Sequence, residues 1–212
     1  MRRAVAPALA LAVAVAAAIP LAWCAAARAD FVRGSIKIDV RDGAGKPREA
    51  EVKVHGAAGG AETAVARVGD VYVASGLVDG DYTVAVAGGG ETAVHVAGRM
   101  DRGVVFVLGG KKPGIVALGA HDVACDAVDG AVVEAVAFAP HGGLGAGRID
   151  VKEAKHGNKV VCSAIVAGGA ATLRLVPGDY TMTAKLVGGG AAMERYKLKR
   201  DQTPYPLAFR TR

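Results

Sequence analysis

The tetrapeptide Gly-Asp-Tyr-Thr occurs twice, at 80–83 and at 178–181, and each copy opens an alternating stretch that ends in three glycines. Alternation of apolar and polar residues is the period of a half-buried β-strand. Glycine and aspartate before the tyrosine are turn residues, so each copy is the start of a strand. The copies lie 98 residues apart. This period is the size of a domain and predicts two tandem domains of one kind, not a solenoid of short repeats.

Period-2 patterning extends through the rest of the chain. Ile36, Ile38 and Val40 alternate with charged residues, whereas the run 104–108 is continuously apolar, as in a strand covered on both faces. We count about seven such runs in 31–109 and seven or eight in 114–212. Short strands at this spacing are typical of a β-sandwich. Glycine interrupts nearly every window and costs a helix interior about 1 kcal/mol. The predicted fold is all-β, with two tandem Ig-like antiparallel β-sandwiches.

The repeated tetrapeptide has a structural interpretation within this fold. Glycine and aspartate form the turn, and the tyrosine ring is buried while its hydroxyl bonds main chain near the corner, as in Ig-type sandwiches. The predicted turn and corner residues are Gly80, Asp81, Tyr82, Gly178, Asp179 and Tyr180.

The N-terminal 29 residues read as a signal peptide and not as part of the fold. A basic start is followed by a short apolar stretch and by Ala27-Arg28-Ala29, the small-x-small pattern that precedes signal-peptidase cleavage. An uncleaved anchor is the alternative, although the apolar stretch is shorter than the ~20 residues of a spanning helix. Lipid attachment at Cys24 is a third reading, and the bulky Trp23 before it argues against that reading. The mature protein is expected to be periplasmic or extracellular and not integral to a membrane.

Charge and turn composition define the remaining organisation. The net charge of +6 falls to +3 when Arg2, Arg3 and Arg28 leave with the signal peptide. That charge is too small and too dispersed for a nucleic-acid partner. The segment Gly109-Gly110-Lys111-Lys112-Pro113 is flexible, charged and closed by proline. We therefore expect domains at 30–109 and 114–212, joined by a linker at 110–113.

Two cysteines remain after cleavage, Cys125 and Cys162. In an exported chain an even pair predicts a disulfide, whereas in the cytosol such cysteines would be inert thiols or metal ligands. Cys125 lies in a loop rich in ligand types, with His121, Asp122, Asp126 and Asp129. Zinc accepts all three ligand types, but the loop has no recognised ligand spacing. The alternatives are therefore a metal site, which His141, Asp150 or His156 could join through folding, and a polar loop with one bridged cysteine.

No catalytic pattern or cofactor motif is present in the sequence. Ser35, Ser75 and Ser163 are the serines of the mature chain, and none lies in a Gly-x-Ser-x-Gly elbow. Zincin, Walker and dinucleotide-binding motifs are also missing. The mature chain has no tryptophan with which to stack a sugar. We expect a protein that is not an enzyme and has no cofactor.

The first half resembles a known family of exported modules. The alternating run 34–40, the turn 42–47, the run 50–54 and the segment 76–82 are similar to the carboxypeptidase regulatory-like domain, a prealbumin-like β-sandwich. The same residues resemble Ig-like repeats appended to bacterial von Willebrand type A proteins. In 113–212 the likeness is limited to Pro177–Tyr180. The resemblance implies a non-catalytic module.

The predicted function follows from the export signal, the fold and this resemblance. We expect an exported module for protein binding or structural spacing at the cell envelope, with another envelope or secreted protein as its partner. The alternative is an exported metal-binding protein that uses the loop His121–Asp129. The sequence sets no oligomeric state.

Overall fold

The computed structural model describes residues 33–211 apart from 57–59, 99, 111–112, 141, 158 and 200–204. These residues form sixteen strands and one turn of 3-10 helix, η1 (Ala154–His156). The all-β prediction is therefore confirmed. The predicted signal peptide 1–29, including Cys24, lies outside the described residues, as does part of the predicted linker. In the part that is described, no helix is long and apolar enough to cross a bilayer.

The first half of the chain forms two sheets. One sheet has the order β4 (Val65–Val68), β5 (Val71–Leu77), β1 (Gly34–Asp42), β8 (Asp101–Leu108) and β9 (Gly114–Val116). The other has the order β3 (Glu62–Thr63), β2 (Val52–Gly56), β6 (Gly80–Val86) and β7 (Gly90–Val96). We call them together the first pair of sheets. The eight strands up to β8 are one more than the sequence indicated, because β3 and β4 are short separate pieces.

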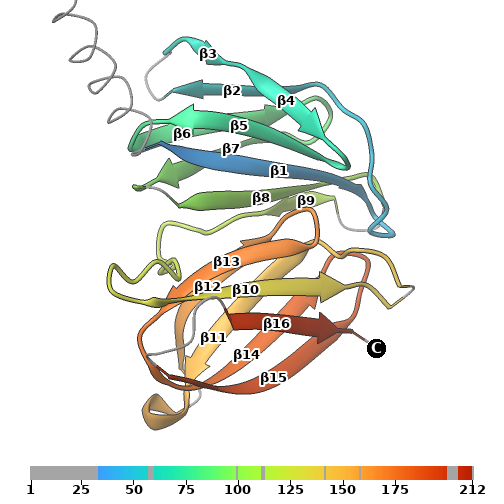
Figure 1. Ribbon diagram of the computed structural model, residues 1–212. Helices are drawn as coiled ribbons and strands as arrows, with labels where there is room; N and C mark the ends of the chain where they lie inside the picture. The colour runs from blue at the N-terminus through green and yellow to red at the C-terminus, as the bar shows by residue number, and fades with distance from the viewer. Residues whose placement is uncertain are drawn as a thin grey trace, which may run out of the picture.

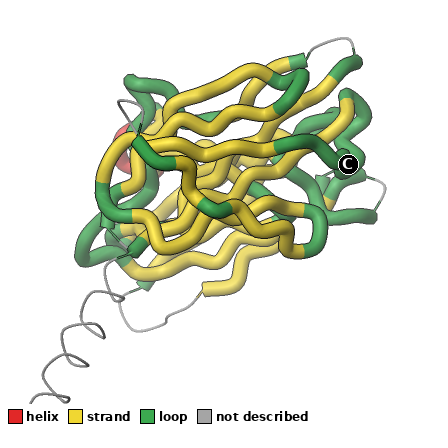
Figure 2. The backbone as a smooth tube through the Cα atoms, turned by 90° about the horizontal axis from the view of Figure 1, so that it is seen from above, coloured by secondary structure: helices red, strands yellow, loops and turns green. Residues whose placement is uncertain are grey.

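The second half forms two further sheets. One has the order β13 (Ala170–Leu175), β10 (Ala131–Phe138) and β16 (Tyr205–Arg210). The other has the order β12 (Val160–Val166), β11 (Gly147–Glu153), β14 (Gly178–Leu186) and β15 (Ala191–Leu198). We call them the second pair of sheets. It is stacked on the first pair, with β8 and β9 on the side that faces β12 and β13 (Figure 1). Seen from above, strands cross the body and many of the loops lie at its ends (Figure 2).

The two pairs of sheets repeat one connectivity. The first strand of each half, β1 or β10, lies between an antiparallel neighbour and a parallel one, β8 or β16, which is the last long strand of that half. These two pairings are the parallel ones among the ladders of the described strands. They arise because the chain crosses to the other sheet and returns before the last strand is added. The two Gly-Asp-Tyr-Thr copies begin β6 and β14, which occupy equivalent interior positions.

Each pair of sheets encloses its own apolar core. Ile36, Val84 and Phe106 are fully buried in the first core, and Ile149 and Phe209 are fully buried in the second. A third, smaller cluster of Val105, Ala146 and Ile165 joins residues of both halves. The inward-facing members of the alternating strands therefore supply the two large cores, and the third cluster connects them.

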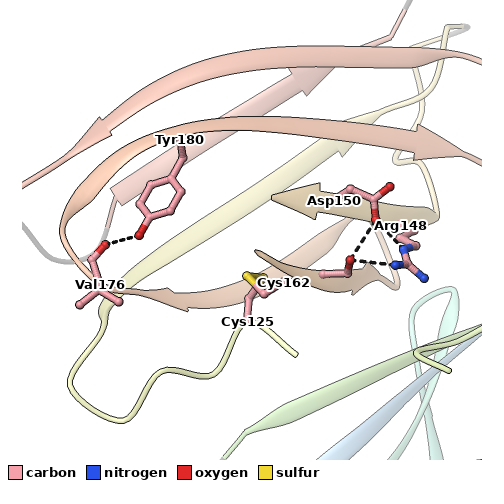
Figure 3. The surroundings of a disulfide bond; sticks show 7 residues. Cys125, Arg148, Asp150, Cys162, Val176 and Tyr180 are labelled. Atoms are coloured by element: carbon pink, nitrogen blue, oxygen red, sulfur yellow. Dashed lines mark hydrogen bonds and ion pairs between the residues drawn. A yellow bond between two sulfur atoms is a disulfide. The ribbon is translucent and has the colours of Figure 1, made fainter. Parts of the chain in front are cut away.

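The two repeated tyrosines occupy the same place in each half. The Tyr82 hydroxyl donates to the Val78 carbonyl at 3.0 Å, and the Tyr180 hydroxyl donates to the Val176 carbonyl at 2.7 Å (Figure 3). Burial raises the pKa of the Tyr180 hydroxyl, and the negative charge of Glu153 raises it further. The hydroxyl therefore stays protonated and keeps donating to the turn that precedes its own strand.

We expect Tyr82→Phe and Tyr180→Phe each to lower the free energy of unfolding by about 0.5–1.5 kcal/mol. The substitution removes one hydrogen-bond donor from a part-buried carbonyl and keeps the ring. Urea unfolding of each variant measures the loss. An unchanged free energy in both variants would show that neither hydroxyl holds its corner.

Candidate binding cleft between the two pairs of sheets

Strand β8 is buried on both faces. Phe106 and the other even-numbered residues of the run 104–108 belong to the first core. Val105 points the other way and packs with Ala146 and Ile165 of the second half. The continuous apolar run predicted a strand covered on both faces, and the burial of all five of its residues confirms this. The second covering layer is the second pair of sheets.

A buried ion pair lies at the same junction. Asp39 and Arg41 on β1 are 0% and 3% exposed, and Arg41 donates to both Asp39 carboxylate oxygens at 2.6 and 2.8 Å. Arg41 also donates to the carbonyls of Gly45 and, in the second half, Leu144. The Gly168 amide of the second half donates to Asp39 at 2.7 Å. The ion pair therefore connects β1 to two turns of the other half.

The segment between β9 and β10, residues 117–130, is called the connector here. Its main chain pairs with β12, since Ser163 N donates to Val123 O at 2.8 Å and Cys125 N to Ser163 O at 3.2 Å. It also pairs with β13, since Arg174 N donates to Cys125 O at 2.7 Å and Ala127 N to Arg174 O at 3.2 Å. Both strands are terminal in their sheets. The connector thus covers two sheet edges that would otherwise expose unpaired main chain.

A disulfide attaches the connector to β12. The sulfur atoms of Cys125 and Cys162 are 2.12 Å apart, and both residues are buried (Figure 3). The bond lies within the segment that pairs with β12. It also removes both sulfurs as thiolate ligands, because a disulfide sulfur carries no negative charge.

Arg148 on β11 organises a polar cluster beside this disulfide. Its two terminal nitrogens donate to the two Asp122 carboxylate oxygens, each at 2.7 Å. Its Nε donates to Asp150 at 2.6 Å, and Nη2 also donates to the Ser163 hydroxyl at 2.9 Å. That hydroxyl donates in turn to Asp150 at 2.9 Å. Ser163 is therefore a satisfied, buried hydroxyl, and Asp122 holds the connector on the sheet.

The cluster keeps its carboxylates ionised. The hydrogen bond from Arg148 lowers the pKa of Asp122 to about 2, and the Gly119 amide lowers it further. The same contact raises the pKa of Arg148. Burial acts to raise the pKa of Asp150, but hydrogen bonds from Arg148 and Ser163 outweigh it and lower the pKa overall. These charges are therefore fixed at neutral pH.

We expect acid to loosen the connector. The folded pKa of Asp122 lies below its ordinary value, so its contribution is complete above about pH 4 and is lost as the pH falls toward about 2. The Gly119 amide, which donates to Asp122 at 2.8 Å, should lose protection from hydrogen exchange over that range. The Gly145 amide, which donates to a carbonyl in the same half, is the control. Equal loss at both amides would indicate general unfolding instead.

The predicted metal residues do not gather around one point. Asp122 is held by Arg148, and Asp126 accepts from Arg102 at 2.7 Å. His121 and Asp129 are exposed. Within the described ranges there is no group of three or more His, Cys, Asp or Glu residues that could hold a metal. His141 lies outside those ranges, and so does the side chain of His156. The structure gives the metal hypothesis no support.

A cleft of about 500 Å³ opens where the two pairs of sheets meet beside the connector. Nine of its 25 lining residues are alanine, and its polar lining holds two ion pairs and one hydrogen-bonded pair of histidine and aspartate. The ion pairs are Lys37 with Asp101 at 2.8 Å and Arg102 with Asp126 at 2.7 Å, and the hydrogen-bonded pair is His95 with Asp81 at 2.7 Å. The lining contains four aspartates, one lysine and one arginine, and Arg148 neutralises Asp122 from outside the lining, so a charge of −1 remains with histidine neutral. Such a narrow, mixed cleft at an interface of two halves is a typical place for a ligand.

One wall of this cleft, the connector, contains Asp122 and Asp126, which the sequence marked as candidate metal ligands, whereas the residues of the other wall carried no prediction of a ligand-binding role. Lys37 lies in β1, whereas Asp101 and Arg102 begin β8, and no local pattern links the two strands. The pair of Asp81 and His95 carries a signal, because the glycine turn at 88–90 sets a hairpin in which these two residues face each other. Hairpin register alone could therefore have located this pair.

No protein-family model and no curated protein sequence matches the chain. Several solved structures, among them the following three, show a distant likeness to this chain. The Bacillus anthracis TIE protein is 15% identical over 85% of this chain and 34% of its own, with a TM-score of 0.33. A streptococcal ancillary pilin is 14% identical over 86% and 63%, with a TM-score of 0.27. The major pilin subunit of Bacillus cereus is 10% identical over 84% and 99%, with a TM-score of 0.28. This chain thus spans about a third of the TIE protein and under two thirds of the ancillary pilin.

Proposed function

We propose that this protein is an exported, non-catalytic module that binds another envelope or secreted protein and holds it at a fixed geometry. The observation that carries the proposal is the junction between the two pairs of sheets. A buried ion pair, an apolar cluster and the covered strand β8 join the halves. A fixed junction is what a presenting or spacing module needs. An enzyme would instead need side chains that are free to exchange a proton with a substrate or to donate an electron pair to it.

The internal use of charge supports a non-catalytic role. Asp122, Asp150 and Ser163 are all bonded to Arg148, and Asp126 is bonded to Arg102. These groups hold the connector and β11 in place. The Ser163 hydroxyl donates to Asp150, but, against the effect of burial, the hydrogen bonds from Arg148 and Ser163 lower the pKa of that carboxyl, and so weakly basic a carboxylate is a poor general base at neutral pH.

The proposal includes two domains and a family resemblance. The separate cores of the two pairs of sheets support a division of the chain near the expected linker 110–113. The pairing of β9 with β8 supports assigning Gly114–Val116 to the first domain, so that the connector makes the crossing. The repeated connectivity and the turn at Asp42, whose carboxylate accepts from Ala44 N and Lys46 N, suit a carboxypeptidase regulatory-like module.

Export and partner binding are tested together in the native cells. Mass spectrometry of the purified native protein should find an N-terminus at Asp30. A photo-crosslinking residue placed at an exposed apolar position, Val78, Val176 or Met193, should capture one specific envelope or secreted protein. An N-terminus at Met1 in a cytosolic fraction, or no specific adduct from any of the three positions, would reject the proposal. One tightly bound metal per mature chain would favour the metal-binding alternative.

A further inference from the structure

The edge of strand β7 forms part of the wall of the cleft. Ala93, Val94 and His95 are consecutive and all line the cleft. Successive side chains of a strand point to opposite faces of its sheet, so three consecutive residues can line one cavity only where that cavity runs along the strand's edge. β7 is the terminal strand of the sheet β3-β2-β6-β7. The cleft therefore lies against a sheet edge.

The main chain of this edge is available for pairing. The His95 carbonyl accepts from Arg102 Nε at 3.1 Å, which places the His95 main-chain groups on the side away from β6. By the two-residue period, the Ala93 amide and carbonyl point the same way. Among the described residues, the Ala93 and His95 amides donate to no backbone carbonyl outside their own ladder. Two amides and one carbonyl thus face the cleft without a strand beside them.

The cleft admits an extended chain and favours a basic one. Small side chains such as Ala93, Ala117 and Ala120 line it, so a main chain can approach both walls. With Asp122 neutralised by Arg148, the lining keeps a charge of −1, whereas the chain without its predicted signal peptide carries +3. Asp81 is 67% exposed beside this edge, and Asp126 is 33% exposed on the connector wall. Cationic side chains that alternate along a peptide would meet these two carboxylates.

We propose that the cleft binds an extended basic peptide segment of a partner protein, which adds as a strand to the free edge of β7. Main-chain pairing supplies affinity in this mode, and pockets for alternate side chains supply specificity. The added strand should end at the Arg102–Asp126 ion pair, because the Arg102 side chain already donates a hydrogen bond to the His95 carbonyl. The inference rests on the proposed function as a protein-binding module and names the surface and the partner chemistry.

The test is a titration of the mature protein with blocked heptapeptides, followed by amide chemical shifts. The peptide Lys-Val-Lys-Val-Lys-Val-Lys should saturate and shift the Ala93 and His95 amides. Its Glu-Val counterpart should bind at least about tenfold more weakly, because the aspartates repel it. Raising the salt concentration should lower the affinity of the lysine peptide, because salt screens the attraction between exposed charges.

Two variants locate the binding. Ala93→Pro removes the outward amide but no bond to β6, and it should abolish binding. Arg195→Pro at the equivalent place on β15, opposite Thr181 as Ala93 is opposite Thr83, should leave binding unchanged. Asp81→Asn, at an exposed position, should weaken the lysine peptide about threefold or more and leave the fold intact.

Equal binding of the two peptides, or binding that survives Ala93→Pro, would overturn the inference. So would shifts of the Ala93 amide that depend on protein concentration in the absence of peptide. Those shifts would mean that a second copy of this chain binds the edge of β7. A specific crosslink from Val176 or Met193, far along the chain from β7, would leave the proposed function standing if the peptides failed. If neither a specific crosslink nor peptide binding is found, the proposed function itself is rejected.

Discussion

Replacing Asp39 by alanine should destabilise this protein by about 3–5 kcal/mol. The side chain is fully buried and accepts from Arg41 Nε and Nη2 and from the Gly168 amide. Its removal leaves the Arg41 guanidinium in a site with 3% exposure and no counter-charge. Breaking a buried pair costs this much because one charge remains desolvated and uncompensated. Urea unfolding followed by tyrosine fluorescence measures the loss.

A surface ion pair in the same half provides the matched control. Lys53 and Glu51 lie 2.9 Å apart but are 48% and 66% exposed, so Glu51→Ala should leave the urea midpoint nearly unchanged. Because Asp39 and Arg41 also hold Gly168 and Leu144, Asp39→Ala should in addition let the two halves reorient, which small-angle scattering would register as a broader distance distribution. A loss below about 1 kcal/mol would mean that water reaches the guanidinium and that the ion pair does not fix the junction.

The junction separates what the sequence could predict from what it could not. Alternation on β1 correctly placed Ile36, Ile38 and Val40 in a core. It said nothing of Asp39, whose face of the sheet is covered by the second half of the chain. A charged residue at an outward position is normally solvated, so only the contact between distant segments reveals this burial. The apolar run 104–108 carried the one local signal that the outward face of this sheet is covered.

The connector shows a similar limit. Its composition of histidine, cysteine and aspartates suited a metal, and those residue types gave no reason to expect Arg148 from β11 or Arg102 from β8 as partners. Charge pairing across strands depends on which strands become neighbours, and that is decided by topology. The same topology produced the cleft, whose walls come from β7 on one side and the connector on the other. Neither the arginine partners nor the cleft has a sequence pattern of its own.

The second large effect is expected for the bond between Cys125 and Cys162. Replacing both residues by alanine should lower the free energy of unfolding by about 3–4 kcal/mol, the chain-entropy value for closing a loop over a separation of 37 residues. The loss should be larger in the second half, so the Tyr180 corner should unfold at a lower urea concentration than the Tyr82 corner. Amide exchange resolved by residue distinguishes the two transitions.

Thiol chemistry tests the same bond independently of stability. Denatured, unreduced mature protein should show no reactive thiol, because Cys24 leaves with the predicted signal peptide and the remaining pair is bonded. Two reactive thiols per chain would contradict the bond and return Cys125 to the set of available metal ligands beside His121. The alanine double variant also separates the two roles of the connector. If the main-chain pairs of Val123, Cys125 and Ala127 suffice to hold it, the Ser163 and Arg174 amides stay protected after the sulfurs are removed. If they exchange freely, the disulfide is what keeps the connector over the edges of β12 and β13, and with it one wall of the cleft.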